Sequence, residues 1–216
     1  MRTVALIPLR GGSKSIPYKN ITSFAGKPLC YWTCLAASKA DSIDAVYVST
    51  EDQKIKEVVK ALGLGIEVID RPVEFAQDDS STESVMKHFM ETVPDFDVLV
   101  TLQATSPQTQ ASHIDEAHAL FRDKGFDSLL TAVRVKRFFW KEEGMPYNYD
   151  YKKRPRRQEF SGTLMENGAF YITKKGILER EGNRLGGKIG IYEMPAYTAT
   201  EIDEPSDWDE LERRSK

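Results

Sequence analysis

Short apolar, β-branched segments alternate with helix-like segments over the first two-thirds of the chain. Strands are expected at residues 4–9, 45–49, 66–69, 98–102 and 128–135. Helices are expected at 28–40, 52–62, 81–90 and 112–124, several of them flanked by capping residues. This order predicts an α/β fold, in which a mostly parallel sheet is covered by helices on both faces.

The alternation breaks between residues 137 and 162, where the chain is aromatic, basic and contains proline without a clean period. Such a stretch indicates an extended excursion or a small lobe rather than another βα unit. Regular segments then resume, with strands at 169–172 and 190–194 and helices at 174–180 and 206–214. We therefore expect one domain over residues 1–216, with 137–165 as an excursion from it.

Charge and hydropathy exclude some classes of protein. The 216 residues carry a formal net charge of −3, which implies no general attraction to nucleic acid or to an anionic membrane. The apolar run at the N-terminus is too short for a signal segment or a membrane span, and no other segment approaches that length. Cys30 and Cys34 are expected to be reduced thiols, because no further cysteine or nearby histidine completes a metal site. Together these features predict a cytoplasmic protein.

The segment that follows the first strand is rich in small residues and cations. Residues 10–14 (RGGSK) place Arg10 and Lys14 in one turn, where backbone amides and positive charge can converge on phosphate. The spacing is neither that of a P-loop nor Gly-x-Gly-x-x-Gly. From these residues alone, a phosphate site and a plain turn with solvated cations both remain open.

Three more polar clusters are expected at the edge of the sheet where ligands of open α/β folds bind. Arg71 leads into the acidic and hydroxyl-rich segment 78–82, which is either part of a site or a charged loop with a helix cap. Gln103 ends a strand and can hydrogen-bond a polyhydroxyl substrate. Glu201 and Asp203 follow a strand-like stretch near Tyr197, so that they would share a face and suit Mg²⁺ unless they are merely solvated. Phosphate-binding cations and paired carboxylates are the parts that metal-dependent nucleotidyl transfer needs.

Seven segments in order resemble the signature blocks of the CMP-sialic acid synthetases (acylneuraminate cytidylyltransferases). They are residues 6–20 (LIPLRGGSKSIPYKN), 48–50 (VST), 71–78 (RP with Asp78), 103–107 (QATSP), 154–158 (RPRRQ), 166–171 (ENGAFY) and 201–208 (EIDEPSDW). The resemblance covers nearly the whole chain, and the variants of several blocks are most similar to the animal-type branch. It implies a Rossmann-like fold of the nucleotide-diphospho-sugar transferase type.

The resemblance implies transfer of CMP from CTP to the anomeric hydroxyl of a sialic-acid-type nonulosonic acid, with release of pyrophosphate. N-acetylneuraminic acid and KDN are the expected substrates, and legionaminic acid or another 3-deoxy-2-keto sugar acid is the alternative. A different class of protein would be a nucleotide-sugar-binding module that has lost catalysis. The joint presence of Arg10, Lys19, Arg157 and Asp203, the expected catalytic residues, argues against that class.

Eight residues are assigned to the nucleotide by the resemblance. Four would hold the triphosphate and offset charge on the leaving pyrophosphate: Arg10, Ser13, Lys14 and Lys19. Four would contact the cytidine part: Asn20, Arg71, Ser80 and Thr82.

The metal and the sugar acid are assigned in the same way. A Mg²⁺ cofactor would be held by Asp203 with Glu201, lowering the pKa of the attacking hydroxyl and orienting the α-phosphate. The sugar-binding residues would be Gln103, Lys141, Arg156 and Arg157, with the arginine pair binding the sugar carboxylate. In the family, the segment with the arginines crosses a homodimer interface, so these arginines would serve the partner's active site. The aromatic residues of this segment are expected to be buried dimer surface rather than a shelf for the sugar.

Four positions depart from the family pattern. Ser15 stands where glycine is usual, and Glu201 where aspartate is common. Gln108 and Thr109 replace a Leu-Arg pair that bacterial relatives often carry, which removes the basis for an arginine contact there.

Overall fold

β1 (Thr3–Pro8) lies near the middle of a seven-stranded sheet in the computed structural model, which describes residues 1–214. The strand order is β5-β4-β1-β6-β8-β7-β9. The other bounds are β4 (Ala45–Thr50), β5 (Glu67–Asp70), β6 (Val98–Leu102), β7 (Ser128–Val135), β8 (Thr163–Lys174) and β9 (Ile189–Met194). Every neighbouring pair is parallel except the two that involve β8. The prediction of a mostly parallel sheet is therefore confirmed.

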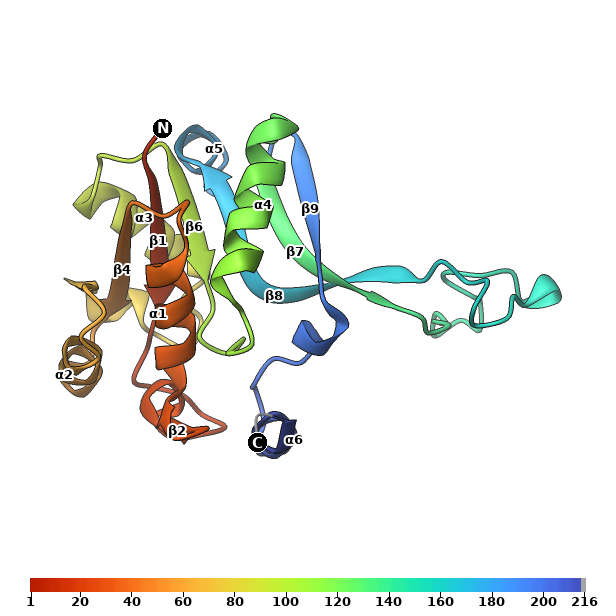
Figure 1. Cartoon of the computed structure of the whole chain (residues 1–216), viewed down its shortest axis with the longest axis horizontal. Helices are drawn as coiled ribbons and strands as arrows, with labels where there is room; N and C mark the ends of the chain where they lie inside the picture. Colours follow the sequence, from red (N-terminus) through yellow and green to blue (C-terminus); the bar gives the residue numbers. More distant parts are fainter. Residues whose placement is uncertain (215–216) are drawn as a thin grey trace.

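Helices cover the sheet on both faces, as expected. The helices are α1 (Leu29–Lys39), α2 (Gln53–Ala61), α3 (Thr82–Thr92), α4 (Ala111–Asp123), α5 (Lys175–Glu181) and α6 (Pro205–Arg214). Figure 1 shows α1 and α4 on the near side of the sheet. Side chains alternate along β1, so that Ala5 and Ile7 join the core beneath α1, α2 and α4, while Val4 and Leu6 join the core beneath α3 and α5. A strand that is buried on both faces is apolar throughout, and this explains the uninterrupted run at 4–9.

Capping residues determine where several helices begin. The Asp52 carboxylate accepts a hydrogen bond from the Ile55 amide at 2.9 Å and starts α2. The Ser81 hydroxyl accepts from the Ser84 amide at 3.2 Å and starts α3. Because such caps are encoded locally, the helix bounds lie close to those expected from the sequence.

Residues 136–162 leave the body of the molecule between β7 and β8, and we call this segment the arm. Figure 1 shows it projecting far from the sheet, with a short 3₁₀ helix (Tyr151–Lys153) at its free end. β8 begins at Thr163, much earlier than the expected 169–172, because its first residues pair with the end of β7 at the root of the arm. The expected excursion of 137–165 thus includes three residues of β8.

The prediction of a strand near Tyr197 is wrong. Residues Ala196–Ala199 form a 3₁₀ helix, in which the Thr198 amide and hydroxyl both donate to the Pro195 carbonyl. Pro195 directly follows β9 and has no N–H with which to extend the ladder, so the chain turns there. Glu201 and Asp203 therefore lie in irregular chain rather than on a strand.

No helix within residues 1–214 has the length and apolarity that crossing a membrane requires.

Candidate active site

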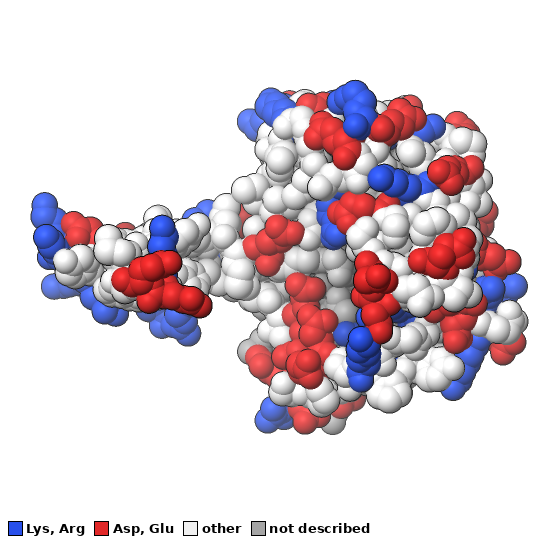
Figure 2. Space-filling model, turned by 180° about the vertical axis from the view of Figure 1, so that it is seen from behind, with Lys and Arg blue, Asp and Glu red and all other residues white. Residues whose placement is uncertain are grey.

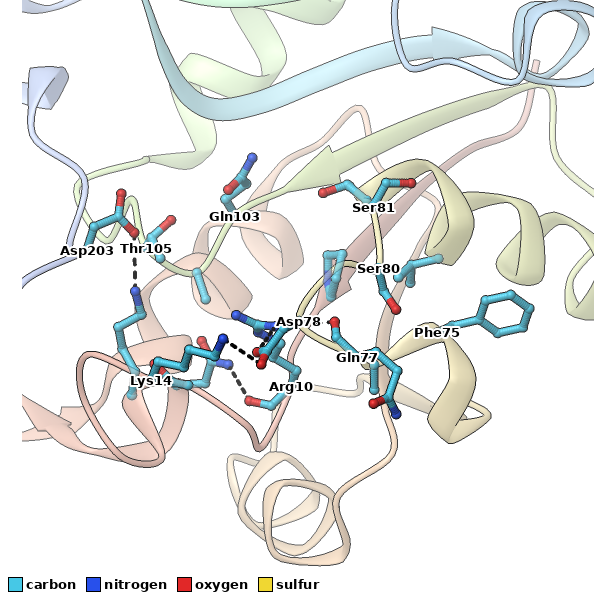
Figure 3. A pocket seen from close by; sticks show the side chains of 18 of the residues that line it. Arg10, Lys14, Phe75, Gln77, Asp78, Ser80, Ser81, Gln103, Thr105 and Asp203 are labelled. Carbon is cyan, nitrogen blue, oxygen red and sulfur yellow. Dashed lines mark hydrogen bonds and ion pairs between the residues drawn. The ribbon is translucent and has the colours of Figure 1, made fainter.

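A cavity of about 540 Å³ opens at the carboxyl ends of β1, β5 and β6. The strand order changes direction between β1 and β6, since the chain adds β4 and β5 on one side of β1 before it places β6 on the other. Ligands of open α/β sheets bind at such a point, because the loops after adjacent strands diverge there. Figure 3 shows side chains from these loops turned toward one another across the cavity.

Ten of the residues predicted for the site line this cavity. They are Arg10, Ser13, Lys14, Lys19, Asn20, Arg71, Ser80, Thr82, Gln103 and Asp203. They come from five separate stretches of the chain, so the fold brings together the polar clusters that the sequence presents apart. Residues that the sequence interpretation did not assign also line the cavity, among them Phe75, Gln77, Ser81, Val85 and Thr105.

The cations of the first loop converge on a single carboxylate. Arg10 Nη1 lies 3.2 Å from Asp78 Oδ1, and Lys14 Nζ lies 2.7 Å from Asp78 Oδ2 (Figure 3). Lys14, and to a smaller extent Arg10, holds the pKa of Asp78 below its usual value. One anionic group can therefore contact both cations at once, which is the arrangement that a phosphate oxygen cluster requires.

Lys19 joins the first loop to the segment that carries Asp203. Its Nζ donates to the Ile202 carbonyl at 2.8 Å and pairs with Asp203 Oδ1 at 3.2 Å. Ser15 adds a second connection, because its hydroxyl donates to the Asp203 carbonyl. The serine that departs from the family pattern is thus used to hold the two segments together.

Asp203 and Glu201 differ in environment. Asp203 is exposed at the cavity wall, whereas Glu201 does not line the cavity. Burial, with smaller contributions from Asp203 and Glu166, raises the pKa of Glu201 to about 7. Gly168 makes room for this side chain, since a Cβ at its position would lie 2.6 Å from Glu201 Oε1.

The Asp203 carboxylate is a candidate magnesium ligand at the cavity wall. Residues 1–214 contain no group of three or more acidic, histidine or cysteine side chains placed to hold a metal. Mg²⁺ is commonly held by only one or two carboxylates, with water and substrate phosphates as its other ligands. Asp203 fits that smaller set as a single carboxylate at the cavity wall, whereas Glu201 does not line the cavity.

Arg71 is almost completely buried beneath the first loop. Its Nη2 donates to the Leu9 carbonyl at 2.6 Å and to Glu51 Oε2 at 2.7 Å. Its Nε is buried and has no partner within the described residues. An unsatisfied buried donor at a cavity wall is costly, and a ligand with a hydrogen-bond acceptor would satisfy it.

Two other residues predicted to contact the cytidine bind backbone carbonyls. The Asn20 amide donates to the Arg10 carbonyl at 3.1 Å, which holds the first loop in shape. The Ser80 hydroxyl donates to the Glu74 carbonyl at 3.0 Å across its own loop. Both still line the cavity.

Three predicted sugar-binding residues do not join the site. Lys141, Arg156 and Arg157 are exposed on the arm and are not among the residues that line the cavity. Figure 2 shows lysine and arginine side chains gathered toward the free end of the arm, away from the body. Within one chain these cations are separate from the loops that form the cavity.

Comparisons with known proteins agree with this geometry. Residues 4–214 match the protein-family model described as cytidylyltransferase. N-acylneuraminate cytidylyltransferase A of Danio rerio is 41% identical over 97% of this chain and 50% of its own length. N-acylneuraminate cytidylyltransferase of Streptococcus agalactiae serotype III is 29% identical over 96% of this chain and 52% of its own. The chain therefore spans about half the length of the curated relatives it matches.

Solved structures share the fold at low sequence identity. CMP:2-keto-3-deoxy-manno-octonic acid synthetase, complexed with CTP, superposes with a TM-score of 0.77 at 18% identity, covering 99% of this chain and 98% of that one. A 4-diphosphocytidyl-2C-methyl-D-erythritol synthase gives a TM-score of 0.66 at 14% identity, covering 98% of each chain.

Proposed function

The chain belongs to the cytidylyltransferase family, and from this membership we propose that it transfers CMP from CTP to a sialic-acid-type nonulosonic acid. The observation that carries the proposal is the layout of the cavity. Arg10 and Lys14 converge on one anion at the first loop, and Asp203 stands beside Lys19 at the part of the wall formed by residues 203 and 204. A triphosphate that lies along the loop would bring its α-phosphate toward the carboxylate.

The nucleotide would be held at both of its ends. Arg10, Ser13, Lys14 and Lys19 would bind the triphosphate, with the phosphates taking the position that Asp78 now occupies. The buried Nε of Arg71 would donate to an acceptor on the cytosine ring, and Asn20, Ser80 and Thr82 would complete the contacts to the cytidine.

At the α-phosphorus, the reaction forms one P–O bond and breaks another. The anomeric oxygen of the sugar acid attacks the α-phosphorus in line, the bond to the bridging oxygen of pyrophosphate breaks, and the hydroxyl proton leaves to solvent. Asp203 would hold Mg²⁺, and Glu201, which does not line the cavity, would reach the metal only through water. The metal when bound would lower the pKa of that hydroxyl and neutralise phosphate charge. Lys19 and Arg10 would stabilise negative charge on the leaving group.

The sugar acid would be bound by residues from two chains. Gln103 lines the cavity and would hydrogen-bond the sugar hydroxyls. Arg157 and Arg156 would bind the carboxylate through the guanidinium fork, and Lys141 would contact substrate beside them. Because these three residues lie on the arm, we infer a homodimer in which each arm reaches the partner's cavity, and 137–165 is then a dimerisation excursion of a single domain.

Pyrophosphate release tests the proposal. Purified protein is incubated with CTP, Mg²⁺ and, in turn, N-acetylneuraminic acid, KDN, legionaminic acid and 3-deoxy-manno-octulosonic acid. Turnover is expected with N-acetylneuraminic acid or KDN, and comparison of kcat/KM for these two acids identifies the preferred substrate. Asp203→Ala should abolish turnover while CTP binding survives in part. Tight CTP binding without turnover on any acid would instead favour a nucleotide-sugar-binding module.

A further inference from the structure

A carboxylate outside the assigned site connects the first loop to Arg71. Glu51 lies at the turn between β4 and α2. Its Oε1 accepts a hydrogen bond from the Gly11 amide at 2.7 Å, and its Oε2 pairs with Arg71 Nη2 at 2.7 Å. The same Nη2 donates to the Leu9 carbonyl at 2.6 Å. One side chain therefore holds the loop expected to bind phosphate and the residue expected to bind the base.

The pair between Glu51 and Arg71 is shielded from solvent. The Arg71 side chain is 3% exposed and that of Glu51 is 15% exposed. An ion pair on the surface contributes little, but removing one member of a buried pair leaves an uncompensated charge, so the remaining partner must move or gain solvent. Loss of the Glu51 charge is therefore expected to displace Arg71.

The loop also fits closely against this turn. A Cβ on Gly11 would lie 2.6 Å from Asp52 Oδ2, and the other oxygen of Asp52 caps α2. Gly11 is thus the residue that lets the loop approach, and its amide is engaged by Glu51. Arg10 and Lys14, on either side of Gly11, face the cavity instead.

We infer that Glu51 is a positioning residue for the nucleotide, which sets the first loop and Arg71 at the separation that a cytidine triphosphate spans. This inference rests on the proposed function, because it takes CTP as the ligand. Nothing in the geometry lets Glu51 touch the substrate, since both of its oxygens are directed to protein donors. Its effect is expected on CTP binding and not on the sugar acid.

Calorimetric titration with CTP tests the inference. Glu51→Gln keeps an acceptor for one of the two donors but removes the charge opposite Arg71, and we expect its Kd for CTP to rise about tenfold or more. Glu57→Gln is the matched control, because Glu57 is an exposed acid on α2 whose carboxylate, among residues 1–214, accepts a hydrogen bond from Gln53 alone. The Kd of this control should stay within about twofold of wild type. In steady state, the KM for CTP should rise in Glu51→Gln, while the KM for the sugar acid does not.

A second variant separates positioning from folding. Glu51→Asp keeps the charge on a shorter side chain that cannot reach both donors, so it should show a smaller rise in Kd with a near-native thermal transition. If either Glu51 variant is folded and binds CTP as wild type does, Glu51 is structural only and the inference is wrong. Dependence of CTP binding on Glu51 in a protein that turns over no sugar acid would refute the proposed function but support this inference. Failure of the wild-type protein to bind CTP would refute both.

Discussion

Asp78 occupies the place where the first loop is expected to hold phosphate. Its carboxylate contacts both Arg10 and Lys14, and these cations lower its pKa, so it stays ionised at any pH near neutrality. A nucleotide must displace this carboxylate before its phosphates can reach the two cations. Asp78 thus acts as a competing anion within the free site.

We predict that Asp78→Asn binds inorganic tripolyphosphate more tightly than wild type does. The gain should be about two- to five-fold, because the competing ion pairs are exposed and therefore weak. Asp79→Asn is the control, since Asp79 is the adjacent acid and forms no ion pair with the loop. Calorimetry at low salt measures both. Weaker binding by Asp78→Asn alone would show that this carboxylate supports the ligand rather than competing with it.

The pKa of Glu201 predicts a pH dependence of stability. Burial raises it from 4.5 to about 7, so between these values the folded chain binds more protons than the unfolded chain. The free energy of unfolding should therefore fall as the pH rises through this window, and level off above about pH 7. Glu201→Gln removes the titrating group, and its free energy of unfolding should fall less over the same range.

Urea unfolding in the presence of a metal chelator measures this difference. Glu204→Gln serves as the control, because Glu204 is an exposed neighbour and should leave the pH profile of wild type unchanged. Parallel profiles for wild type and Glu201→Gln would contradict the raised pKa.

At the scale of elements, the arm presents aromatic side chains to solvent in the single chain. Trp140 is 52% exposed and Tyr147 is 65% exposed, whereas Phe138 stacks on Tyr149 and on Phe160 within the arm. The stacked rings explain how a segment with little regular structure keeps a shape. The exposed rings need a partner surface, which we propose is a second copy of the chain.

We predict that Trp140→Glu weakens the proposed dimer, because a charge would be placed where the interface would bury an aromatic anchor. Light scattering after size exclusion should then report a mass near 24.5 kDa for the variant, half that of wild type, at low micromolar concentration. Glu142→Gln, on the same arm, should remain a dimer. The Trp140→Glu monomer should bind CTP but lose turnover, and a variant that stays dimeric would refute the role of this ring.

Most elements follow from local patterns, and the exceptions have physical causes. The caps at Asp52 and Ser81 and the apolar run of β1 are properties of neighbouring residues, so their positions were predictable. The start of β8 at Thr163 was not predictable, since these residues form a strand only because the end of β7 pairs with them. The stretch near Tyr197 has a strand-like composition, but Pro195 turns it away from the sheet.

At the scale of the whole molecule, the proposed site is complete only when an arm from a partner supplies Arg157. Arg157→Ala and Asp203→Ala homodimers should each be inactive. The two variants are then mixed so that their subunits exchange. In each heterodimer, the Arg157→Ala chain provides a cavity with wild-type Asp203, and the Asp203→Ala chain supplies that cavity with a wild-type arm. About a quarter of the wild-type activity per chain should therefore return.

The matched control pairs Arg10→Ala with Asp203→Ala. Both substitutions affect the body of the chain, so each cavity of the heterodimer carries one defect and no activity should return. Recovery in this control, or none with Arg157→Ala, would contradict a site shared between chains.

The sequence by itself determined the α/β class, the breaks at the arm and the residue types of the site. These depend on periodicity, caps and local motifs, which act between residues close together in the chain. Only the tertiary structure decided which polar groups meet. It placed Asp78 between Arg10 and Lys14, joined Ser15 to the Asp203 carbonyl, and connected Glu51 with both Gly11 and Arg71. Such contacts join residues from separate loops, and no local pattern records them because the sheet alone sets which loops become neighbours.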